Sequence, residues 1–337
     1  MRAALPTPLG RTIRAFFSDY LSRQRGLSPH TISSYRDSLV LLLRFTAIKT
    51  KKPLARLDFR TLSAPQVLSF LAYLERERHN SATTRNVRLA AIHAFFRYAA
   101  TQYPEELELC QRVLGIPFKR ARSRTIEYLE YEEIQHLLTA VDKSARDGLR
   151  DYALLATLFN TGARVQEMLN VRACDLYLTK PFQVRLLGKG RKERFCPLWS
   201  QTANILRTFC NKQRVDLGSD VRIFRNHRGE ELTRFGVRYL LRKYLGRAAL
   251  DVPGIARKRL HPHSIRHSTA IAMLKAGVDL STISQWLGHA SLDTTNKYAA
   301  IDLDLKRKAI ARVQPIPMRG RGEWHKNSTI IDWLEAL

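Results

Sequence analysis

The chain has 337 residues, of which 45% are hydrophobic, which is enough apolar material for two domains and excludes wholesale disorder. It carries 57 Lys and Arg residues against 30 Asp and Glu residues, so its formal net charge is +27. Such an excess predicts a polyanionic partner. Nucleic acid is favoured because the basic residues recur along the whole sequence, and an anionic membrane surface and chance basicity are the weaker alternatives.

Cysteine usage and hydropathy argue against a disulfide-rich and a membrane-spanning protein. The four cysteines form no CxxC pair and no metal-ligand spacing, so we interpret them as reduced structural thiols: Cys110, Cys174, Cys196 and Cys210. No stretch is long and apolar enough to span a membrane, and the first residues lack the apolar region of a secretory signal. We therefore expect no membrane partner and a soluble, cytoplasmic protein associated with the nucleoid.

The N-terminal third is predicted to be a bundle of four short helices. The first covers residues 12–21, where apolar side chains recur at helical spacing. The second begins with Ser28 as its N-cap and Pro29 as its first helical residue, and Ser63 and Ser81 begin the third and the fourth.

The fourth helix carries the candidates for DNA contact in this third. We expect its apolar face to point inward, namely Val87, Ala91, Phe95 and Tyr98. We expect its arginines to face solvent, namely Arg85, Arg88 and Arg97. Helices with cationic faces can lie against a duplex groove, and their first turns reach phosphates or base edges. The predicted DNA-binding residues are therefore Thr83, Arg85, Asn86 and Arg88, while each arginine taken alone also fits an ordinary solvated face.

A linker is predicted between two domains. From residue 103 the helical periodicity fades, and the stretch ends in PFKRARSR, a proline followed by a basic and polar run. We place the linker at residues 111–124, which leaves an N-terminal domain at 1–110. Its charge suits a segment that crosses close to a DNA backbone, and it also suits an ordinary exposed linker.

The following sequence begins with two predicted helices, at 130–141 and 149–160. The second is nearly apolar and is therefore predicted to be central. It ends at Thr161-Gly162, and the next helix opens with Arg164. A guanidinium at the mouth of a buried turn is costly unless it meets an anion or a carboxylate, so Arg164 is predicted to pair with a phosphate or with Glu167 on the next turn.

The segment FQVRLLGKGRKERFCPL predicts a β-hairpin with Lys189 at its tip, because period-two segments flank GKGRK. A lysine on a tight turn can enter a cleft and donate a proton to a leaving oxygen, although a GKG turn by itself is more often a plain charged turn. The segment lacks the spacing and the Ser/Thr of a Walker A loop, so we predict no ATP and no other cofactor.

Two further helices, at 200–213 and 233–249, are predicted on either side of a turn that contains Asn226 and Gly229. The stretch 261–298 follows, and its residue types suit phosphate chemistry. His263 and Arg266 are three residues apart and share one face of a helix, and the planar fork of arginine matches two phosphate oxygens. Tyr298 offers a phenolic oxygen for covalent catalysis if nearby cations stabilise its phenolate.

The histidines of this stretch also raise the question of a metal site. His261, His263 and His267 lie close in sequence, but no carboxylate or cysteine completes a ligand set. The adjacent Arg266 would also repel a cation. We therefore predict that no metal is bound here.

Four motifs occur in the order TGARVQE, GKGRKERF, HPHSIRHSTA and LGHASLDTTNKYAA, and together they closely resemble the tyrosine recombinases, or phage integrase family. The Xer-type and transposon-borne branches are the nearest likeness. LSPHTISSY and SATTRNVRLAAIHAFFRYA resemble the SAM-like core-binding domain of that family. The resemblance implies a mainly α fold with a small antiparallel β-sheet, in which a helical core-binding domain precedes an α+β catalytic domain at 125–312 and a C-terminal tail at 313–337.

The resemblance also implies a catalytic set: Arg164, Lys189, His263, Arg266, His289 and Tyr298. The two arginines would clamp the scissile phosphate, and Tyr298 would attack it to give a 3′-phosphotyrosyl intermediate. Lys189 would protonate the leaving 5′ oxygen. His263 would assist proton transfer around the nucleophile, and His289 would hydrogen-bond a non-bridging oxygen. Glu167 would orient Arg164 rather than act in the chemistry.

The last ten residues, STIIDWLEAL at 328–337, form a candidate amphipathic helix with Ser328 as its cap. Members of the family often dock a C-terminal helix onto a neighbouring protomer, and packing on its own domain is equally open here.

The sequence thus predicts a site-specific recombinase that cleaves and rejoins double-stranded DNA as a homotetramer on paired sites, alone or with a related recombinase. The alternatives are a type IB topoisomerase, which shares the chemistry, and a non-catalytic DNA-binding architectural or regulatory protein.

Overall fold

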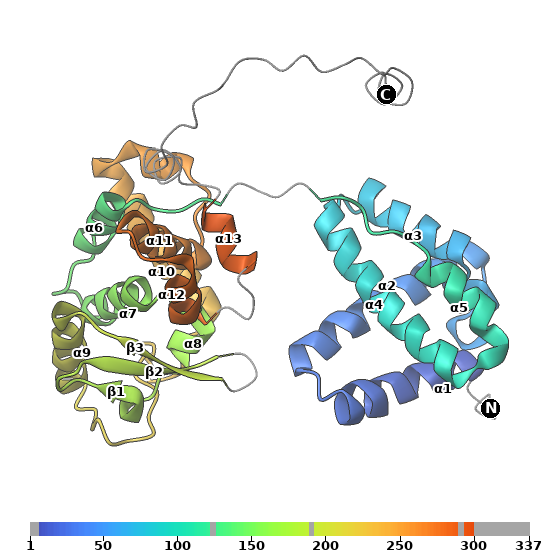
Figure 1. Ribbon diagram of the computed structural model, residues 1–337, viewed down its shortest axis with the longest axis horizontal. Helices are drawn as coiled ribbons and strands as arrows, with labels where there is room; N and C mark the ends of the chain where they lie inside the picture. Colours follow the sequence, from blue (N-terminus) through green and yellow to red (C-terminus); the bar gives the residue numbers. More distant parts are fainter. Residues whose placement is uncertain (1–6, 122–125, 189–191, 289–292, 300–337) are drawn as a thin grey trace, which may run out of the picture. The chain divides into compact units, whose positions relative to one another are not determined.

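The computed structural model describes residues 7–121, 126–188, 192–288 and 293–299. The chain divides into two compact units, Met1–Arg124 and Thr125–Leu337, each with its own hydrophobic core (Figure 1). The fold is mainly helical and contains one small antiparallel sheet, as the sequence predicted. No helix in the described part of the chain is long and apolar enough to cross a membrane.

The N-terminal unit is a helical bundle. Its α-helices are α1 (Pro8–Ala15), α2 (Pro29–Thr50), α3 (Ala64–Arg76), α4 (Ala82–Gln102) and α5 (Leu107–Leu114), and the π-helix η1 (Phe16–Gln24) continues α1. Two of the three predicted caps make their hydrogen bond: the Ser28 hydroxyl accepts from the backbone N–H of Thr31, and Ser81 accepts from that of Thr84. Ser63 is at the N-cap position of α3, but its side chain makes no capping hydrogen bond. Large aromatic rings fill the core between the helices, including Phe16, Phe70, Phe95 and Phe96.

The orientation predicted for the start of α4 is wrong. Val87, expected inside, is 50% exposed, and Arg85, expected in solvent, is only 4% exposed. Arg85 Nη1 instead donates to the backbone carbonyl of Pro117 at 3.0 Å. The chain that follows α5 therefore covers this face of α4, and helical periodicity within α4 could not reveal that neighbour. Further along the helix, Ala91, Phe95 and Tyr98 are buried and Arg97 is exposed, as predicted.

The first unit also extends beyond the predicted boundary at residue 110. Helix α5 runs to Leu114, and Cys110, Val113 and Ile116 are part of the N-terminal core. The predicted linker at 111–124 therefore starts too early, because its first residues form the end of a packed helix. The next residues are tied down as well: the Asn86 side chain donates to the carbonyl of Lys119 and accepts from its N–H.

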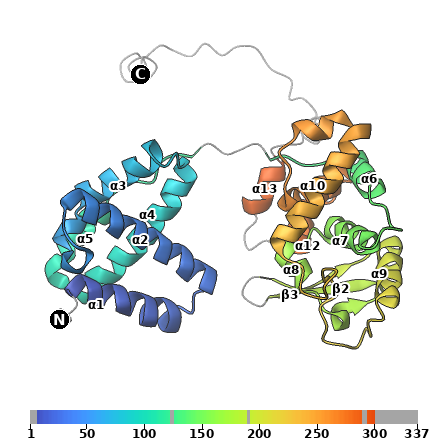
Figure 2. The same ribbon diagram turned by 180° about the vertical axis from the view of Figure 1, so that it is seen from behind.

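The C-terminal unit contains the sheet and the remaining helices (Figures 1 and 2). The antiparallel strands are β1 (Leu176–Tyr177), β2 (Gln183–Leu187) and β3 (Glu193–Pro197), in the order β1-β2-β3. The helices are α6 (Tyr131–Thr139), α7 (Gly148–Thr161), α8 (Val165–Leu169), α9 (Ser200–Lys212), α10 (Arg234–Asp251), α11 (Pro262–Lys275), α12 (Leu280–Leu287) and α13 (Asp293–Ala299).

Helix α7 is central to this unit, as its apolar sequence predicted. Nearly all of its residues are buried, and it contacts α6, α8, α9 and α11. A buried ionic group fastens it to α10. The Asp151 carboxylate accepts from Arg150 at 2.6 Å and from the Tyr244 hydroxyl at 2.7 Å. This contact could not be predicted from the sequence, because Tyr244 lies far from Asp151 in the chain.

The predicted hairpin is confirmed. Strands β2 and β3 pair in register, with Leu187 opposite Glu193, and the Gly188 N–H donates to the Lys192 carbonyl at 2.8 Å. Residues 189–191 between these two lie outside the described residues, and so does Lys189 itself.

Candidate active site

Arg266, on α11, is almost fully buried, at 1% exposure. Its Nη1 donates to the Gly162 carbonyl at 2.8 Å, and its Nη2 donates to the Leu287 carbonyl at 2.7 Å. Gly162 closes α7 in the left-handed conformation at φ 58°, and Leu287 is the last residue of α12. One guanidinium on α11 therefore joins the C-terminal ends of two other helices.

The Arg266 side chain still has an unused donor. No acceptor among the described residues lies within hydrogen-bonding range of its buried Nε. Burial, and then the charge of Arg164, lower the pKa of Arg266 to about 10, so it remains a cation at neutral pH. A buried guanidinium with an unsatisfied donor is costly unless an anion completes its coordination.

Arg164 lies at the start of α8, where it is the N-cap residue. Its Nη1 contacts Glu167 Oε1 at 2.7 Å, and the predicted pairing within the turn is therefore present. The Arg164 side chain nevertheless remains partly exposed, so it can still contact an incoming group. Burial opposes ionisation of Glu167, but hydrogen bonds from Arg194 and Arg164 outweigh it and hold the pKa of Glu167 below its usual value.

Tyr298, on α13, is almost fully buried, and its hydroxyl lies 2.8 Å from Nδ1 of His267. Burial raises the pKa of Tyr298, whereas the charges of Arg266 and Arg164 oppose that rise. The sequence analysis considered His267 only as a possible metal ligand, and it predicted no catalytic role for this residue. Its position one residue after Arg266 was the available signal for a site residue.

His263 lies one turn before His267 on α11, and the two rings meet edge to face with their centroids 4.7 Å apart. His263 is nevertheless exposed to solvent as a residue. Partial burial, followed by the charge of Arg266, lowers the pKa of His263 to about 4. This imidazole is therefore neutral near pH 7, which makes it a proton acceptor rather than a fixed cation.

The structure thus brings together four of the six predicted catalytic residues. Helix α11 supplies His263 and Arg266 and contacts both α12 and α13, and the charge of Arg164 acts on Arg266 and Tyr298. The other two, Lys189 and His289, lie outside the described residues. In the described part of the chain, no group of His, Cys, Asp and Glu side chains has the arrangement of a metal site.

The four candidates for DNA contact are on the first turns of α4. Thr83 is exposed, Arg85 is buried against Pro117, and Asn86 holds Lys119. Arg88 is half-buried, and its Nη1 donates to the Ser38 hydroxyl on α2 at 3.1 Å. Of these four, Thr83 is exposed, and Asn86 and Arg88 are half-buried.

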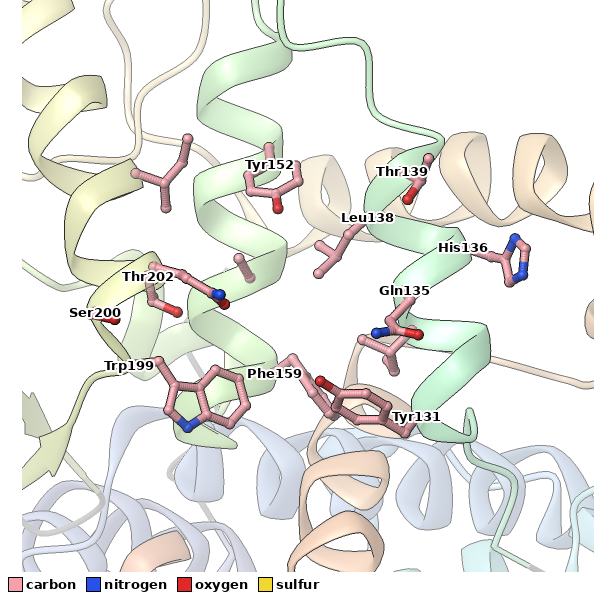
Figure 3. A pocket seen from close by; sticks show the side chains of 14 residues that line it. Tyr131, Gln135, His136, Leu138, Thr139, Tyr152, Phe159, Trp199, Ser200 and Thr202 are labelled. Atoms are coloured by element: carbon pink, nitrogen blue, oxygen red, sulfur yellow. The ribbon is translucent and has the colours of Figure 1, made fainter.

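A pocket of about 890 Å³ lies elsewhere in the C-terminal unit, between α6, α7 and α9 (Figure 3). Tyr131, Phe159 and Trp199 stand along one end of it, and adjacent rings are about 6 Å apart, with centroid distances of 6.1 and 5.8 Å. None of the four predicted catalytic residues that the structure describes lines this pocket. It is therefore separate from the cluster around Arg266.

Comparison with known proteins agrees with this architecture. The profile of the Phage integrase family matches residues 127–304, and that of the phage integrase N-terminal SAM-like domain matches residues 15–103. An integrase/recombinase of Sinorhizobium fredii, y4rC, is 41% identical over 330 residues, which cover 98% of each chain. Tyrosine recombinase XerC of Herpetosiphon aurantiacus is 32% identical over 291 residues, which cover 86% of this chain and 90% of the relative.

Among solved structures, the fold is similar to that of the XerH site-specific recombinase bound to palindromic difH substrate. The TM-score is 0.65 at 22% identity, and the match covers 86% of this chain and 81% of XerH. The two matched domains, the full-length relatives and this shared fold lead to one conclusion: the chain belongs to the phage integrase family, the tyrosine recombinases.

Proposed function

We propose that this chain is a site-specific recombinase that cleaves and rejoins DNA strands through a 3′-phosphotyrosyl intermediate at Tyr298. The observation that carries the proposal is the unsatisfied, buried Nε of Arg266, in a site that also holds Arg164 and the Tyr298 hydroxyl. A phosphodiester supplies the anion that such a site lacks. The net charge of +27 and the relatives named as integrases and recombinases support DNA as the partner.

In the proposed reaction, the Tyr298 oxygen attacks the scissile phosphorus, and the bond from phosphorus to the 5′ oxygen breaks. The guanidiniums of Arg164 and Arg266 neutralise the charge that gathers on the non-bridging oxygens, a task that Mg²⁺ performs in many other phosphoryl transfers. His289 would add a hydrogen bond to one of those oxygens. The covalent intermediate retains the energy of the phosphodiester, so religation needs neither ATP nor another cofactor.

Two protons move in this step. The phenolic proton leaves Tyr298, and the leaving 5′ oxygen gains one. His263 is neutral at pH 7 and lies on the same helix as Arg266, which suits it to proton transfer near the nucleophile. Lys189, at the tip of the β2–β3 hairpin in sequence, is proposed as the donor to the 5′ oxygen. Religation runs the same transfers in reverse.

A suicide substrate tests this function. Its strand is nicked close to the cleavage position, so that the 5′-hydroxyl fragment diffuses away and the covalent complex accumulates. Wild type should form a protein–DNA adduct that resists detergent, and Tyr298→Phe should form none. Tyr177→Phe, at 41% exposure on β1, is the matched control and should form the adduct. Wild type that binds its cognate DNA without any adduct would favour a regulatory protein.

We further propose that the working form is a homotetramer on two paired sites in the nucleoid, alone or with a related recombinase. The C-terminal segment 328–337 is the candidate coupling element, and its structure lies outside the described residues. The sequence of this segment places large apolar residues at helical spacing: Ile330, Ile331, Trp333, Leu334 and Leu337. The aromatic end of the pocket between α6, α7 and α9 offers an apolar surface to such a segment from a neighbouring copy.

The number of protomers on DNA tests the assembly. Mass measurements of complexes should give two protomers on one site and four on a synapsed pair. Removal of residues 328–337 should leave binding to one site intact and abolish the four-protomer species. Relaxation of supercoiled plasmid without recombinant product, by a protein that never pairs sites, would instead indicate topoisomerase activity.

A further inference from the structure

Arg194 lies at the centre of the candidate site, although no catalytic role was predicted for it. It is on β3, opposite Leu186 of β2, and only 13% of its side chain is exposed. Its Nη2 contacts Glu167 Oε2 at 2.7 Å, and its Nε donates to the Trp286 carbonyl at 3.1 Å. The guanidinium therefore bridges the hairpin, helix α8 and the end of helix α12.

The first of these contacts leads directly to Arg164. The Glu167 carboxylate is shared between the two arginines: Oε1 binds the Arg164 side chain, while Oε2 binds the Arg164 backbone N–H and Arg194. One negative charge thus faces two positive charges in a buried setting. The three side chains together keep one net positive charge, which is available to a phosphate at Arg164. An isolated Arg164–Glu167 pair would be neutral.

The second contact fixes the end of α12, the helix that precedes residue 289. Two consecutive carbonyls there accept from two guanidiniums: Trp286 from Arg194, and Leu287 from Arg266. Cations are favoured at this end of a helix, where the carbonyls carry partial negative charge. A Cβ on Gly288 would lie only 3.2 Å from Arg194 Nη1. The guanidinium therefore packs closely against Gly288, which precedes the predicted catalytic residue His289.

The same guanidinium also lies beside the turn of the hairpin. A Cβ on Gly188, the residue before Lys189, would be 3.7 Å from Arg194 Nη1 and 3.6 Å from Glu167 Oε1. Arg194 therefore contacts or borders the chain segments that lead to three of the predicted catalytic residues. Its Nε and Nη2 are directed at protein groups.

We propose that Arg194 is a positioning residue for strand cleavage: it takes up part of the Glu167 charge, which frees Arg164 for the phosphate, and it fixes the end of α12. This inference rests on the proposed function of the site. Arg194 itself makes no contact with DNA in this proposal.

The test compares cleavage of two suicide substrates in single turnover. One carries the ordinary scissile phosphate, and the other carries a neutral methylphosphonate, which removes the charge that the arginines neutralise. Arg194→Met should bind DNA as wild type does and cleave the phosphate about 10- to 100-fold more slowly, the effect of losing the hydrogen bond to the charged Glu167 together with that to the Trp286 carbonyl. On the methylphosphonate its deficit relative to wild type should shrink to about threefold or less.

Arg185→Met is the matched control. Arg185 is on β2 of the same hairpin and pairs with Asp175 at 2.8 Å through its Nε. This variant also leaves a carboxylate without its arginine, but it should cleave both substrates at the wild-type rate. Arg164→Met should show the same dependence on substrate charge as Arg194→Met.

A second variant keeps the proposal testable if Arg194→Met folds poorly. Glu167→Gln removes the charge that Arg194 balances, so Arg194→Met combined with Glu167→Gln should cleave the phosphate faster than Arg194→Met alone. Equal losses on both substrates, an additive double variant or a wild-type rate in Arg194→Met would each overturn the inference. Absence of any adduct in wild type would overturn the proposed function instead.

Discussion

The phenolic oxygen of Tyr298 lies 2.8 Å from Nδ1 of His267, the residue that immediately follows Arg266. The proposed nucleophile is therefore tied to the helix that supplies the buried guanidinium. Because Tyr298 comes from α13 and His267 from α11, this hydrogen bond also joins two elements of the site. It gives the phenol a defined position before DNA arrives.

Replacement of His267 by phenylalanine should slow cleavage. The variant retains a ring next to Tyr298 but loses the hydrogen bond, so we expect about a tenfold lower single-turnover rate, which corresponds to a hydrogen bond of about 1.4 kcal/mol. The rate is measured with the suicide substrate at saturating protein. His227→Phe, in an exposed turn, is the control and should cleave normally. An unchanged rate in His267→Phe would show that the bond has no part in catalysis.

Stability should depend on pH through His263. Its pKa is about 4 in the folded chain and near 6.5 when unfolded, so the unfolded chain binds more protons between these values. The stability that neutral His263 contributes to the folded chain is fully present above pH 6.5 and is lost as the pH falls toward 4. Urea unfolding should therefore show that wild type loses more unfolding free energy between pH 7 and pH 5 than His263→Gln does. Parallel losses in the two proteins would contradict this assignment.

Gly162→Ala should destabilise the C-terminal unit. Gly162 adopts φ 58°, and an added Cβ would lie 2.4 Å from Leu287 Cδ2. The strain and the clash should cost about 2 kcal/mol or more of unfolding free energy. Gly246→Ala is the matched control, since Gly246 is within α10 with open space around it. That exchange should be neutral or stabilising by up to about 1 kcal/mol. Thermal unfolding of both variants provides the comparison.

Tyr244→Phe should weaken folding without touching the site. The exchange leaves the buried Asp151 carboxylate one donor short, so we expect a loss of about 1–3 kcal/mol in unfolding free energy. Tyr239→Phe, on the same helix at 69% exposure, should be close to neutral. Denaturant titration measures both, and equal stability of the two variants would mean that the Asp151 bond contributes nothing.

Substitutions of Arg88 and Arg85, two of the DNA-binding candidates on α4, should have different effects. Arg88 is half-buried on the first turns of α4, so part of the residue remains accessible to a phosphate. Arg88→Gln should lower DNA affinity and reduce the slope of log K against log salt by about 1. Arg85→Gln should mainly destabilise the N-terminal unit, because that guanidinium holds Pro117. Equal salt slopes in Arg88→Gln and wild type would exclude the phosphate contact.

Much of the fold could be predicted because its signals are local. The N-caps Ser28 and Ser81, the break of α7 at Gly162 and the hairpin between β2 and β3 each depend on a few neighbouring residues. The orientation of Arg85 could not be predicted, because the segment that covers it follows a different helix. The hydrophobic period of α4 describes only the residues within α4.

The residues of the candidate site also fall into two groups: those that local motifs indicate and those that depend on distant partners. Motif order indicated Arg164, His263, Arg266 and Tyr298, because residue types and spacing suffice to indicate that chemistry. Arg194 and His267 were missed as site residues because their importance comes from partners that lie far away in sequence: Trp286 for Arg194 and Tyr298 for His267. A long-range pair of this kind becomes visible only when the chain is folded.

The guanidinium of Arg266 fastens the ends of α7 and α12 to α11 as well as facing the site. The same side chain therefore stabilises the fold and belongs to the candidate site, so a substitution of Arg266 affects both. A duplicated copy without a recombination task would lose one hydrogen bond, to His267, if it lost the Tyr298 hydroxyl, whereas loss of Arg266 would release the ends of two helices. Inactive descendants of this protein should accordingly be found with the arginine in place and the tyrosine gone.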